Sequence, residues 1–463
     1  MADYYPYAKR YPVNRGMPEQ GRPREEVLAE LHEMAAQEDD FWQTGRCSGT
    51  MYCGDMEHYA YMAKAFSMYS HVNVLQRDIC PSATRFEGEI IAMTLDMLHG
   101  DQAPEGASPC GSVTSGGTES ILSAILAYRE YYREHRGLEN PQMILPETGH
   151  VAFEKGAHLF GLEVVKAPVD PTTTLVDMDF VRSHITDRTA LLVGSACNYG
   201  YGTIDPIGEL SELAVKHDIG LHVDGCLGGW ILPWGEELGF DIPVFDFRLP
   251  GVSSISADTH KYGYGPKGSS VLCFRDKDLR RSLYFMQQEW SGGKYLSPGI
   301  AGSRSGGILA ATWASLVSLG REGYLGHAKK IFDTSYAMQD AVKSHPELLL
   351  MGKPTFCFSF RSDEFDIYHL NDFMRKRGWR LNGQQHPNAL HMCVTRPQTQ
   401  PGVVDAFARD LTDAVSYAKN PERDKPASGA VYGGLPKGDT AIRKMVEELM
   451  VGMLDAQQAV PEE

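Results

Sequence analysis

The middle of the chain alternates between short apolar runs and stretches with helical spacing of apolar residues. Strand-like runs occupy residues 143–145, 163–167, 190–195 and 221–224. Between them, Leu210, Leu213 and Ala214 share one side of a predicted helix over 207–217. Because strands that alternate with helices form parallel sheets, we predict an α/β fold whose largely parallel sheet is covered by helices on both faces.

The two ends of the chain follow other patterns. Residues 1 to about 20 predict an extended arm, and helical spacing then begins at Pro23. From about residue 311, a long helical pattern is followed by smaller β/α units. The predicted parts are a segment of arm and helices (1–82), a large domain (83–315) and a smaller C-terminal α/β domain (316–463).

Composition narrows the class of protein. With 463 residues, 42% hydrophobic and 22% charged, the chain is expected to form two or three compact units. Its formal net charge of −16 argues against a general nucleic-acid binder. Nine cysteines without a CxxC pair or zinc-type spacing indicate free thiols in a reducing cytoplasm, with no metal site. Neither a signal peptide nor a long apolar run occurs, so we expect a soluble, cytoplasmic protein without a transmembrane segment.

The stretch 252–270 carries the most specific chemistry. An apolar run ends in small polar residues, and His260 and Lys261 follow before Gly, Pro and a second strand-like run. This pattern predicts strand, irregular loop, strand, with Lys261 projecting from the loop. A lone Lys is usually a solvated side chain, but these flanks are apolar and turn-forming. We interpret Lys261 as a candidate nucleophile, held as a neutral amine that attacks a carbonyl.

Two Gly-rich turns are candidate phosphate sites because each precedes a predicted helix. At Gly117 and Thr118, glycine permits a close backbone approach, and the first N–H groups of the helix point at an anion. The loop with Gly302 and Ser303 has the same character. A Gly-Gly-Thr turn is also common as a plain helix cap, so neither turn is diagnostic alone.

Three further residues suit an aromatic cofactor. Asp224 lies at the carboxyl end of a predicted strand, where ligands of open α/β sheets bind. A buried carboxylate there needs a partner, either a protonated pyridine nitrogen or a helix terminus. His150 either stacks on a ring or has a structural role, and the small residues around Cys226 can lie flat against a ring.

These signals occur along the chain in an order that suits pyridoxal phosphate. The phosphate turn at Gly117 comes first, and His150, Asp224 and the pair His260-Lys261 follow. The segments 115–120, 222–229 and 254–270 closely resemble the sphingosine-1-phosphate lyase branch of the group II pyridoxal-phosphate decarboxylase family. The resemblance extends from Ser48 to Gly433. It implies the fold type I, aspartate-aminotransferase-like architecture, pyridoxal phosphate as the cofactor, and a homodimer with shared active sites to which the N-terminal segment contributes.

The resemblance also implies roles for individual residues. The implied cofactor-binding positions are Gly117, Thr118, His150, Asp224, Cys226, His260, Lys261, Gly302 and Ser303. Among them, Lys261 binds the cofactor aldehyde, His150 stacks on the ring and Asp224 pairs with the pyridine nitrogen. The implied substrate-binding positions are Tyr52, Asn73, Gln76, Tyr199, Lys267 and Tyr432. The catalytic positions would be Lys261, Tyr199, Asp224 and His150.

Some of these positions match residues that the family supplies across the dimer interface. The loop at 302–307 would reach the cofactor phosphate of the neighbouring subunit, and Tyr52 and Asn73 would reach the partner's substrate. Lys267 matches the lysine that binds the substrate phosphate.

The stretch 73–78 departs from the family pattern. It reads Asn-Val-Leu-Gln-Arg-Asp, where the family usually has Asn-Pro-Leu-His-Pro-Asp. Gln76 therefore replaces a His expected at the substrate phosphate. Phosphate affinity then rests on Lys267 and Tyr hydroxyls, or Arg77 turns inward.

We expect a lyase that cleaves the C2–C3 bond of phosphorylated sphingoid bases such as sphingosine 1-phosphate, giving a long-chain aldehyde and phosphoethanolamine. Lys261, Tyr199 and the substrate phosphate are alternative proton carriers. Amino-acid decarboxylation on the same scaffold is the alternative function. A non-catalytic protein with this fold is a third interpretation, which the intact set of Lys261, Asp224 and His150 disfavours.

Overall fold

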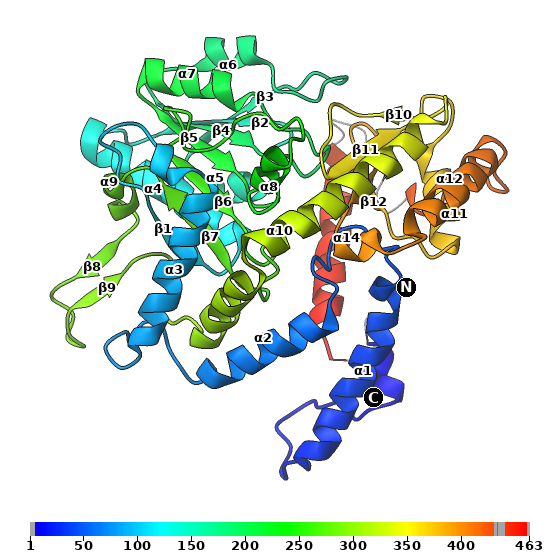
Figure 1. Cartoon of the computed structure of the whole chain (residues 1–463), viewed down its shortest axis with the longest axis horizontal. Coiled ribbons are helices and arrows are strands. Elements are labelled where there is room, and N and C mark those ends of the chain that lie inside the picture. Colours follow the sequence, from blue (N-terminus) through cyan, green and yellow to red (C-terminus); the bar gives the residue numbers. More distant parts are fainter. Residues whose placement is uncertain (1–4, 430–432, 434–439, 461–463) are drawn as a thin grey trace.

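The structure is a computed structural model that describes residues 5–429, 433 and 440–460. At its centre lies a seven-stranded sheet in the order β1-β7-β6-β5-β4-β2-β3 (Figure 1). The strands are β1 (Cys110–Thr114), β2 (Gln142–Pro146), β3 (Glu163–Ala167), β4 (Thr189–Ser195), β5 (Gly220–Asp224), β6 (Ser254–Ala257) and β7 (Ser270–Phe274).

Most of this sheet is parallel. Strands β3, β2, β4, β5 and β6 pair in parallel, whereas β7 runs antiparallel to β6 and to β1. Strands β4 and β5 are buried along their whole length, as expected for strands covered on both faces. The predicted, largely parallel sheet is confirmed, and the reversal at β7 is a feature that the sequence does not predict.

Alternate residues of the strands face two separate hydrophobic clusters. Met143 and Leu191 belong to one cluster, and their neighbours Ile144 and Leu192 belong to the other. Helices α4 (Gly117–Arg136) and α5 (Ala152–Phe160) contribute to the first cluster, and α7 (Ile207–His217), α8 (Leu232–Glu237) and α10 (Gly306–Lys343) contribute to the second. Helices α6 (Met178–His184) and α9 (Lys277–Arg281) lie at the periphery. Because both faces are covered, a ligand reaches this sheet at the strand ends.

A smaller antiparallel sheet of four strands follows, in the order β10-β11-β13-β12. Its elements are β10 (Leu349–Leu350), β11 (Cys357–Arg361), α11 (Ile367–Lys376), β12 (Asn382–Gln384), β13 (Ala389–Cys393) and α12 (Val403–Lys419). The expected large and small α/β parts are confirmed. Helix α10 leads from one to the other and is interrupted at Gly320, where φ is 58° and ψ is 179°. The three-part division at residues 82 and 315 stays a prediction.

The N-terminal segment consists mainly of helices, with α1 (Arg24–Gln43), α2 (Met56–Tyr69) and α3 (Pro81–Met97). Helix α1 projects away from both sheets, whereas α2 lies along α10 (Figure 1). The loop between α1 and α2 is attached to the small sheet, because Ser48 N donates to Arg380 O at 2.9 Å and Gly49 N donates to Cys393 O at 3.0 Å. This attachment places residues 50–53 beside the loop of Lys261.

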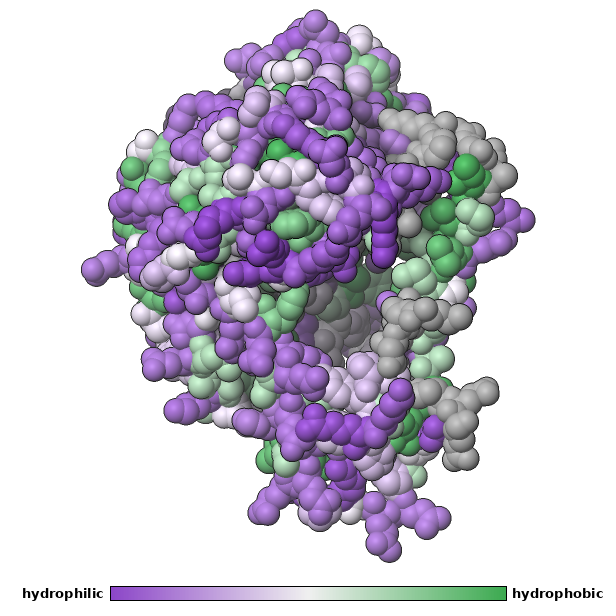
Figure 2. Space-filling view, turned by 90° about the vertical axis from the view of Figure 1, so that its right-hand side faces the viewer, coloured by the Kyte–Doolittle hydropathy of each residue, from purple (hydrophilic) through white to green (hydrophobic). Residues whose placement is uncertain are grey.

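The surface combines polar and apolar areas. Figure 2 shows a hollow in one face of the molecule, with apolar atoms along part of its rim. A hairpin of β8 (Phe285–Gln287) and β9 (Tyr295–Ser297) projects outward in Figure 1 and exposes Phe285 and Leu296. The helices that the structure describes include none that is long and apolar enough to cross a membrane.

Candidate active site

Lys261 lies in the irregular loop between β6 and β7, as the sequence predicts. Its Nζ forms an ion pair of 2.9 Å with Asp258 Oδ2, and the Asp258 side chain is almost fully buried. Burial lowers the pKa of Lys261, but Asp258, Tyr52 and Cys226 together outweigh it, and the net pKa lies above the ordinary lysine value. The ion pair with Asp258 favours the charged amine, and the sequence pattern does not reveal this carboxylate partner; the neutral amine stays a prediction.

His260 is fixed beside the same carboxylate. Its Nδ1 donates to Ser269 O at 2.6 Å, and its Nε2 lies 3.6 Å from Asp258 Oδ2. Burial lowers the pKa of His260, with smaller contributions from Asp258 in the opposite direction and from Lys267 and Lys261. The imidazole is therefore favoured in its neutral form, with the proton on Nδ1.

The Gly-rich turn that opens α4 meets this loop. Gly116, the residue before the helix, has a φ of 147°, and a Cβ placed on it would lie 3.5 Å from His260 Cε1. A Cβ on Gly117 would lie 2.7 Å from Asp258 Oδ2 and 3.0 Å from Cys226 Sγ. Glycine is therefore required at 117 for this close approach. Thr118 follows with its side chain exposed at the first turn of the helix.

Asp224 ends β5, as predicted, and faces the same edge of the sheet. Its Oδ1 accepts hydrogen bonds from Cys226 N at 3.0 Å and from Ser256 Oγ at 3.4 Å. The Cys226 thiol donates to Ser256 Oγ at 3.1 Å. Burial, and then Asp224 and Asp258, raise the pKa of Cys226 well above its usual value, so the thiol stays protonated. Asp224 therefore holds the turn after β5, and it is 7% exposed.

His150 follows β2, two strands away from β5, with β4 between them. Its Nδ1 accepts a hydrogen bond of 3.2 Å from Ala152 N at the start of α5, and its ring is exposed. This bond fixes the imidazole at the carboxyl-end edge of the sheet, where Asp224 also lies.

Tyr52 and Lys267 lie together in the same chain. Lys267 Nζ is 4.7 Å from the centre of the Tyr52 ring and donates a long hydrogen bond of 3.5 Å to His260 O. The Tyr52 ring also contacts Tyr262 edge to face, with 5.1 Å between ring centres. Burial, followed by the nearby Lys261 charge, lowers the pKa of Lys267. Tyr52 therefore reaches the lysines of its own chain, and this placement does not require a second subunit.

Tyr199 lies in the loop after β4 and is half exposed, with 46% of its surface accessible. Its ring centre is 4.6 Å from that of His391 on β13. Burial of the hydroxyl region, with smaller contributions from Cys393 and Cys357, raises the pKa of Tyr199 to about 12. The Tyr199 hydroxyl therefore keeps its proton at neutral pH.

Asn73, Gln76 and Ser303 form a second group of predicted residues. Asn73 Nδ2 donates to Ser303 Oγ at 3.0 Å, which brings the Asn73 stretch and the Gly302 loop together. Their chain neighbours Val74 and Gly302 line a cavity of about 470 Å³, together with Glu119 from the start of α4. Gln76 is exposed.

Arg77 does not compensate for Gln76 within this chain. Its guanidinium pairs with Glu87, which also pairs with Arg304 Nη1 at 2.7 Å. Burial raises the pKa of Glu87, but Arg304 and Arg77 outweigh it and lower the pKa below its usual value. Arg77 is thus held by a carboxylate, and Lys267 is the cation beside Lys261. Tyr432 lies outside the residues that the structure describes.

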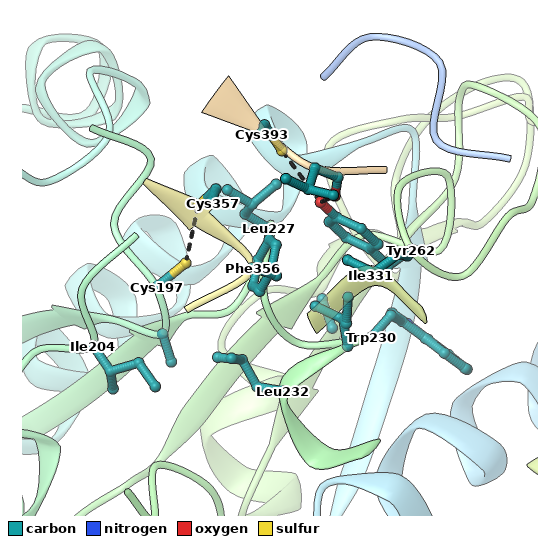
Figure 3. Close-up of a cluster of buried hydrophobic side chains, with 14 of the residues drawn as sticks. Cys197, Ile204, Leu227, Trp230, Leu232, Tyr262, Ile331, Phe356, Cys357 and Cys393 are labelled. Atoms are coloured by element: carbon teal, nitrogen blue, oxygen red, sulfur yellow. Dashed lines mark hydrogen bonds between the residues drawn. The ribbon is translucent and has the colours of Figure 1, made fainter. Parts of the chain in front are cut away.

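Three residues near the site were not singled out by sequence reasoning. They are Asp258, Tyr262 and His391. Asp258 precedes Lys261 by three residues, and a buried lysine requires a partner, so the motif itself contains a signal for it. The Tyr262 hydroxyl donates to Val394 O at 2.6 Å. It also lies 3.2 Å from Cys393 Sγ, and Figure 3 shows both residues in the buried cluster around them. Contacts such as these between distant segments leave no local pattern in the sequence.

The cluster of Lys261, Asp258, Gly117 and Asp224 fits pyridoxal phosphate. Gly117 lets the start of α4 lie directly against Asp258, and the unpaired N–H groups at a helix start suit an anion such as a phosphate. Asp258 Oδ1 is buried and has no hydrogen-bond partner among the described residues, which is what a missing polar ligand leaves. The Lys261 amine, the Asp224 carboxylate and the start of α4 therefore lie in one region of the structure. They suit the aldehyde, the basic ring nitrogen and the phosphate of pyridoxal phosphate, in that order.

Comparison with known proteins agrees with this geometry. Residues 6–361 match the family model described as the pyridoxal-dependent decarboxylase conserved domain. A sphingosine-1-phosphate lyase of Arabidopsis thaliana is 42% identical over 93% of this chain and 79% of its own length. A protein of Legionella pneumophila described as a probable sphingosine-1-phosphate lyase is 35% identical over 84% of this chain and 66% of its own length.

Solved structures agree in fold. The Burkholderia pseudomallei sphingosine-1-phosphate lyase is 57% identical and has a TM-score of 0.93, covering 99% of this chain and all of its own. A glutamate decarboxylase of Lactobacillus brevis, only 19% identical, has a TM-score of 0.76 over 90% of this chain and 98% of its own, and it supports the fold alone. The expected fold type I architecture is confirmed, and the chain belongs to the pyridoxal-dependent decarboxylase family, in its sphingosine-1-phosphate lyase branch.

Proposed function

We propose that this chain is a pyridoxal-phosphate-dependent lyase that cleaves phosphorylated long-chain 2-amino-3-hydroxy compounds such as sphingosine 1-phosphate. The products are a long-chain aldehyde and phosphoethanolamine. The observation that carries the proposal is the pair of lysines, because Lys261 suits an aldehyde and Lys267 supplies a second cation for a phosphate group. Relatives named as sphingosine-1-phosphate lyases are 38–42% identical over most of the chain, which supports the same substrate class.

Several residues would hold the cofactor. Asp224 would pair with the ring nitrogen, and His150 would lie against the ring. The phosphate would bind at the start of α4, with Gly117, Thr118 and His260. When bound, pyridoxal phosphate supplies an electron-accepting ring conjugated to the reacting carbon.

The chain's own residues would bind the substrate and move its protons. Lys267 would hold the substrate phosphate, and the Tyr52 ring would orient the Lys267 ammonium. Bond cleavage requires that the 3-hydroxyl lose a proton and that C2 gain one. Tyr199, whose pKa is raised to about 12, would carry its own proton at neutral pH and suits donation more than abstraction. Lys261 and the substrate phosphate are the other candidate carriers.

The alternative of amino-acid decarboxylation is disfavoured. Relatives that are 38–42% identical are named as sphingosine-1-phosphate lyases, whereas the structurally similar decarboxylases are 15–19% identical. The complete set of Lys261, Asp224 and His150 disfavours a non-catalytic protein.

One assay tests the function. The purified protein, saturated with pyridoxal phosphate, is incubated with sphingosine 1-phosphate, and both long-chain aldehyde and phosphoethanolamine are expected. Lys261→Ala should abolish both products and the visible absorbance band of the bound cofactor. Saturated wild-type protein that shows this band but forms no aldehyde would refute the proposal, and carbon dioxide release from amino acids would then indicate the decarboxylase.

We also propose a homodimer in a reducing, cytoplasmic environment. Exposed apolar side chains on the β8–β9 hairpin, such as Phe285 and Leu296, support an interface with a second copy. Nine free cysteines support a reducing environment. Light scattering of the purified protein that gave the mass of a single chain would contradict the dimer.

A further inference from the structure

A cavity of about 410 Å³ separates α2 from the loop of Lys261. Its lining includes the neutral imidazole of His260 and the two lysines of the loop, Lys261 and Lys267. The rest of the wall is largely apolar, and its α2 side consists of Tyr59, Met62, Ala63 and Phe66, which we call the α2 wall. The volume lies in the range of small-molecule sites.

Part of the α2 wall is left uncovered by the described residues of the chain. Met62 is buried beneath the surface, but Phe66 is 38% exposed and Ala63 is exposed as well. Helix α2 packs on α10, and Phe66 lies against α10, since a Cβ on Gly307 would come within 2.8 Å of its ring. The wall is therefore held in place while it leaves apolar surface facing the cavity, as a site for an apolar ligand does.

We propose that this cavity binds the hydrocarbon chain of the substrate, and that the α2 wall sets the chain length the enzyme prefers. The inference rests on the proposed function, which places the substrate amine at Lys261 and its phosphate at Lys267. The remainder of such a substrate is apolar, and the apolar part of the cavity is continuous with the two lysines. Burial of each methylene then favours binding by about fourfold.

A substitution at Ala63 can test the preference for the length of the substrate's hydrocarbon chain with little effect on the hydrophobic core of the protein. Its side chain is exposed on α2 and lines the cavity, so a larger residue extends into the cavity and not into packed protein. Ala60, on the same helix, is also exposed and does not line the cavity, which makes it a matched control.

The experiment measures kcat/KM of the holoenzyme for phosphorylated 2-amino-3-hydroxy compounds with short and long chains. Wild type should prefer the long chain. Ala63→Trp should reduce kcat/KM for the long chain by roughly fourfold per excluded methylene, and leave the short chain within about twofold. Ala60→Trp should match wild type with both compounds. If Ala63→Trp does not fold, Ala63→Leu should show the same trend with a smaller effect.

Two outcomes separate this inference from the proposed function. If wild type cleaves both compounds and Ala63→Trp changes both equally, the cavity does not bind the chain and the inference is overturned. If no compound is cleaved, the proposed function fails, and calorimetric binding of 3-deoxy analogues decides the inference alone. Equal affinity of wild type and Ala63→Trp for the long-chain analogue would then overturn it.

Discussion

Two neighbouring lysines in the site have different electrostatic surroundings. Lys261 is neutralised by Asp258, a buried carboxylate at 2.9 Å. Lys267 instead lies over the Tyr52 ring and donates to a carbonyl oxygen, contacts that leave its positive charge for a ligand. The positive charge that an incoming phosphate meets is therefore mainly that of Lys267.

Removal of this charge should weaken the binding of phosphorylated substrate. A hydrogen bond to a charged group contributes about 1.5–3 kcal/mol, so Lys267→Met should lower kcat/KM by roughly 10- to 150-fold, mainly through KM. Lys267→Arg should retain part of the activity, and Lys64→Met, an exposed lysine on α2, should retain all of it. Unchanged KM in Lys267→Met would show that the phosphate binds elsewhere.

The same residue gives the activity a pH dependence. Burial and Lys261 lower the pKa of Lys267, so its ammonium loses the proton at a pH below the usual lysine value of 10.5. Affinity for the phosphorylated substrate should be full below this pKa and should fall as the pH rises through it. In Lys267→Arg, this alkaline fall in kcat/KM should move to higher pH.

At the scale of elements, the loop after β4 is docked on the start of β11. Gly202 N donates to Asn198 O at 3.0 Å, and Gly202 O accepts from Thr355 Oγ1 at 3.0 Å. The Gly200 carbonyl accepts hydrogen bonds from Ser359 and Gln384. The small sheet thus determines where the loop presents Tyr199.

A substitution at Gly202 should disturb the docking of this loop on β11. Its φ is 71°, and a Cβ there would lie 1.8 Å from Cys357 O, so Gly202→Ala should displace the loop. We expect a loss of about 1–3 kcal/mol or more in unfolding free energy, and a lower kcat through the displaced Tyr199. Gly208→Ala in α7, where a Cβ meets nothing within 4 Å, should instead be neutral or slightly stabilising. Urea unfolding and kcat measure both effects, and equal stability of the two variants would contradict the docking argument.

Local patterns predicted many elements well. The strand at 163–167 and the helix at 207–217 have their predicted bounds in the structure. β1 was missed because its sequence, Cys-Gly-Ser-Val-Thr, contains a single large apolar residue. The direction of β7 was also missed, since the run Ser-Val-Leu-Cys-Phe reads alike in parallel and antiparallel strands.

The candidate site was predictable to the extent that it rests on consecutive residues. The sequence pattern predicts where the neighbouring strand or helix ends or begins for Lys261, Asp224 and Gly117. The structure brings these three residues together. The ion pair of Arg77 with Glu87 and the contact of Tyr199 with His391 depend on the packing of distant segments. Their residue roles stay predictions until variants are measured.

At the scale of the whole molecule, buried histidines link stability to pH. His222 and His391 are fully buried, and burial lowers the pKa of His222 to about 4 and of His391 to about 3. In the unfolded chain, a histidine binds its proton near pH 6.5. As the pH falls below 6.5, the histidines of the unfolded chain bind protons that the folded protein does not, so acidification favours the unfolded state. Burial raises the pKa of Asp205 to about 7, so between pH 7 and 3.8 the folded protein binds this proton more readily, and acidification through Asp205 favours the folded state.

A comparison of variants isolates the contribution of His391. The unfolding free energy of His391→Phe, relative to wild type, should increase by up to about 1.4 kcal/mol per pH unit as the pH falls from 6.5 towards 4. Asp205 and His222 are common to both proteins and cancel in the difference. His158→Phe, at an exposed histidine, should show a much smaller change. Urea unfolding at several pH values measures the difference, and a constant difference would refute the prediction.

The hydrogen bond from Tyr262 to Val394 has a mechanical consequence. Lys261 is covalently next to Tyr262, whose hydroxyl is held at 2.6 Å by the carbonyl that follows β13 of the small sheet. The loop that carries Lys261 is thus attached to both sheets. Strands β6 and β7 join its two ends to the large sheet, and the Tyr262 hydroxyl joins it to the small sheet. A rotation of one sheet against the other would stretch the hydrogen bond between Tyr262 and Val394. This bond therefore opposes such a rotation and couples it to the position of Lys261.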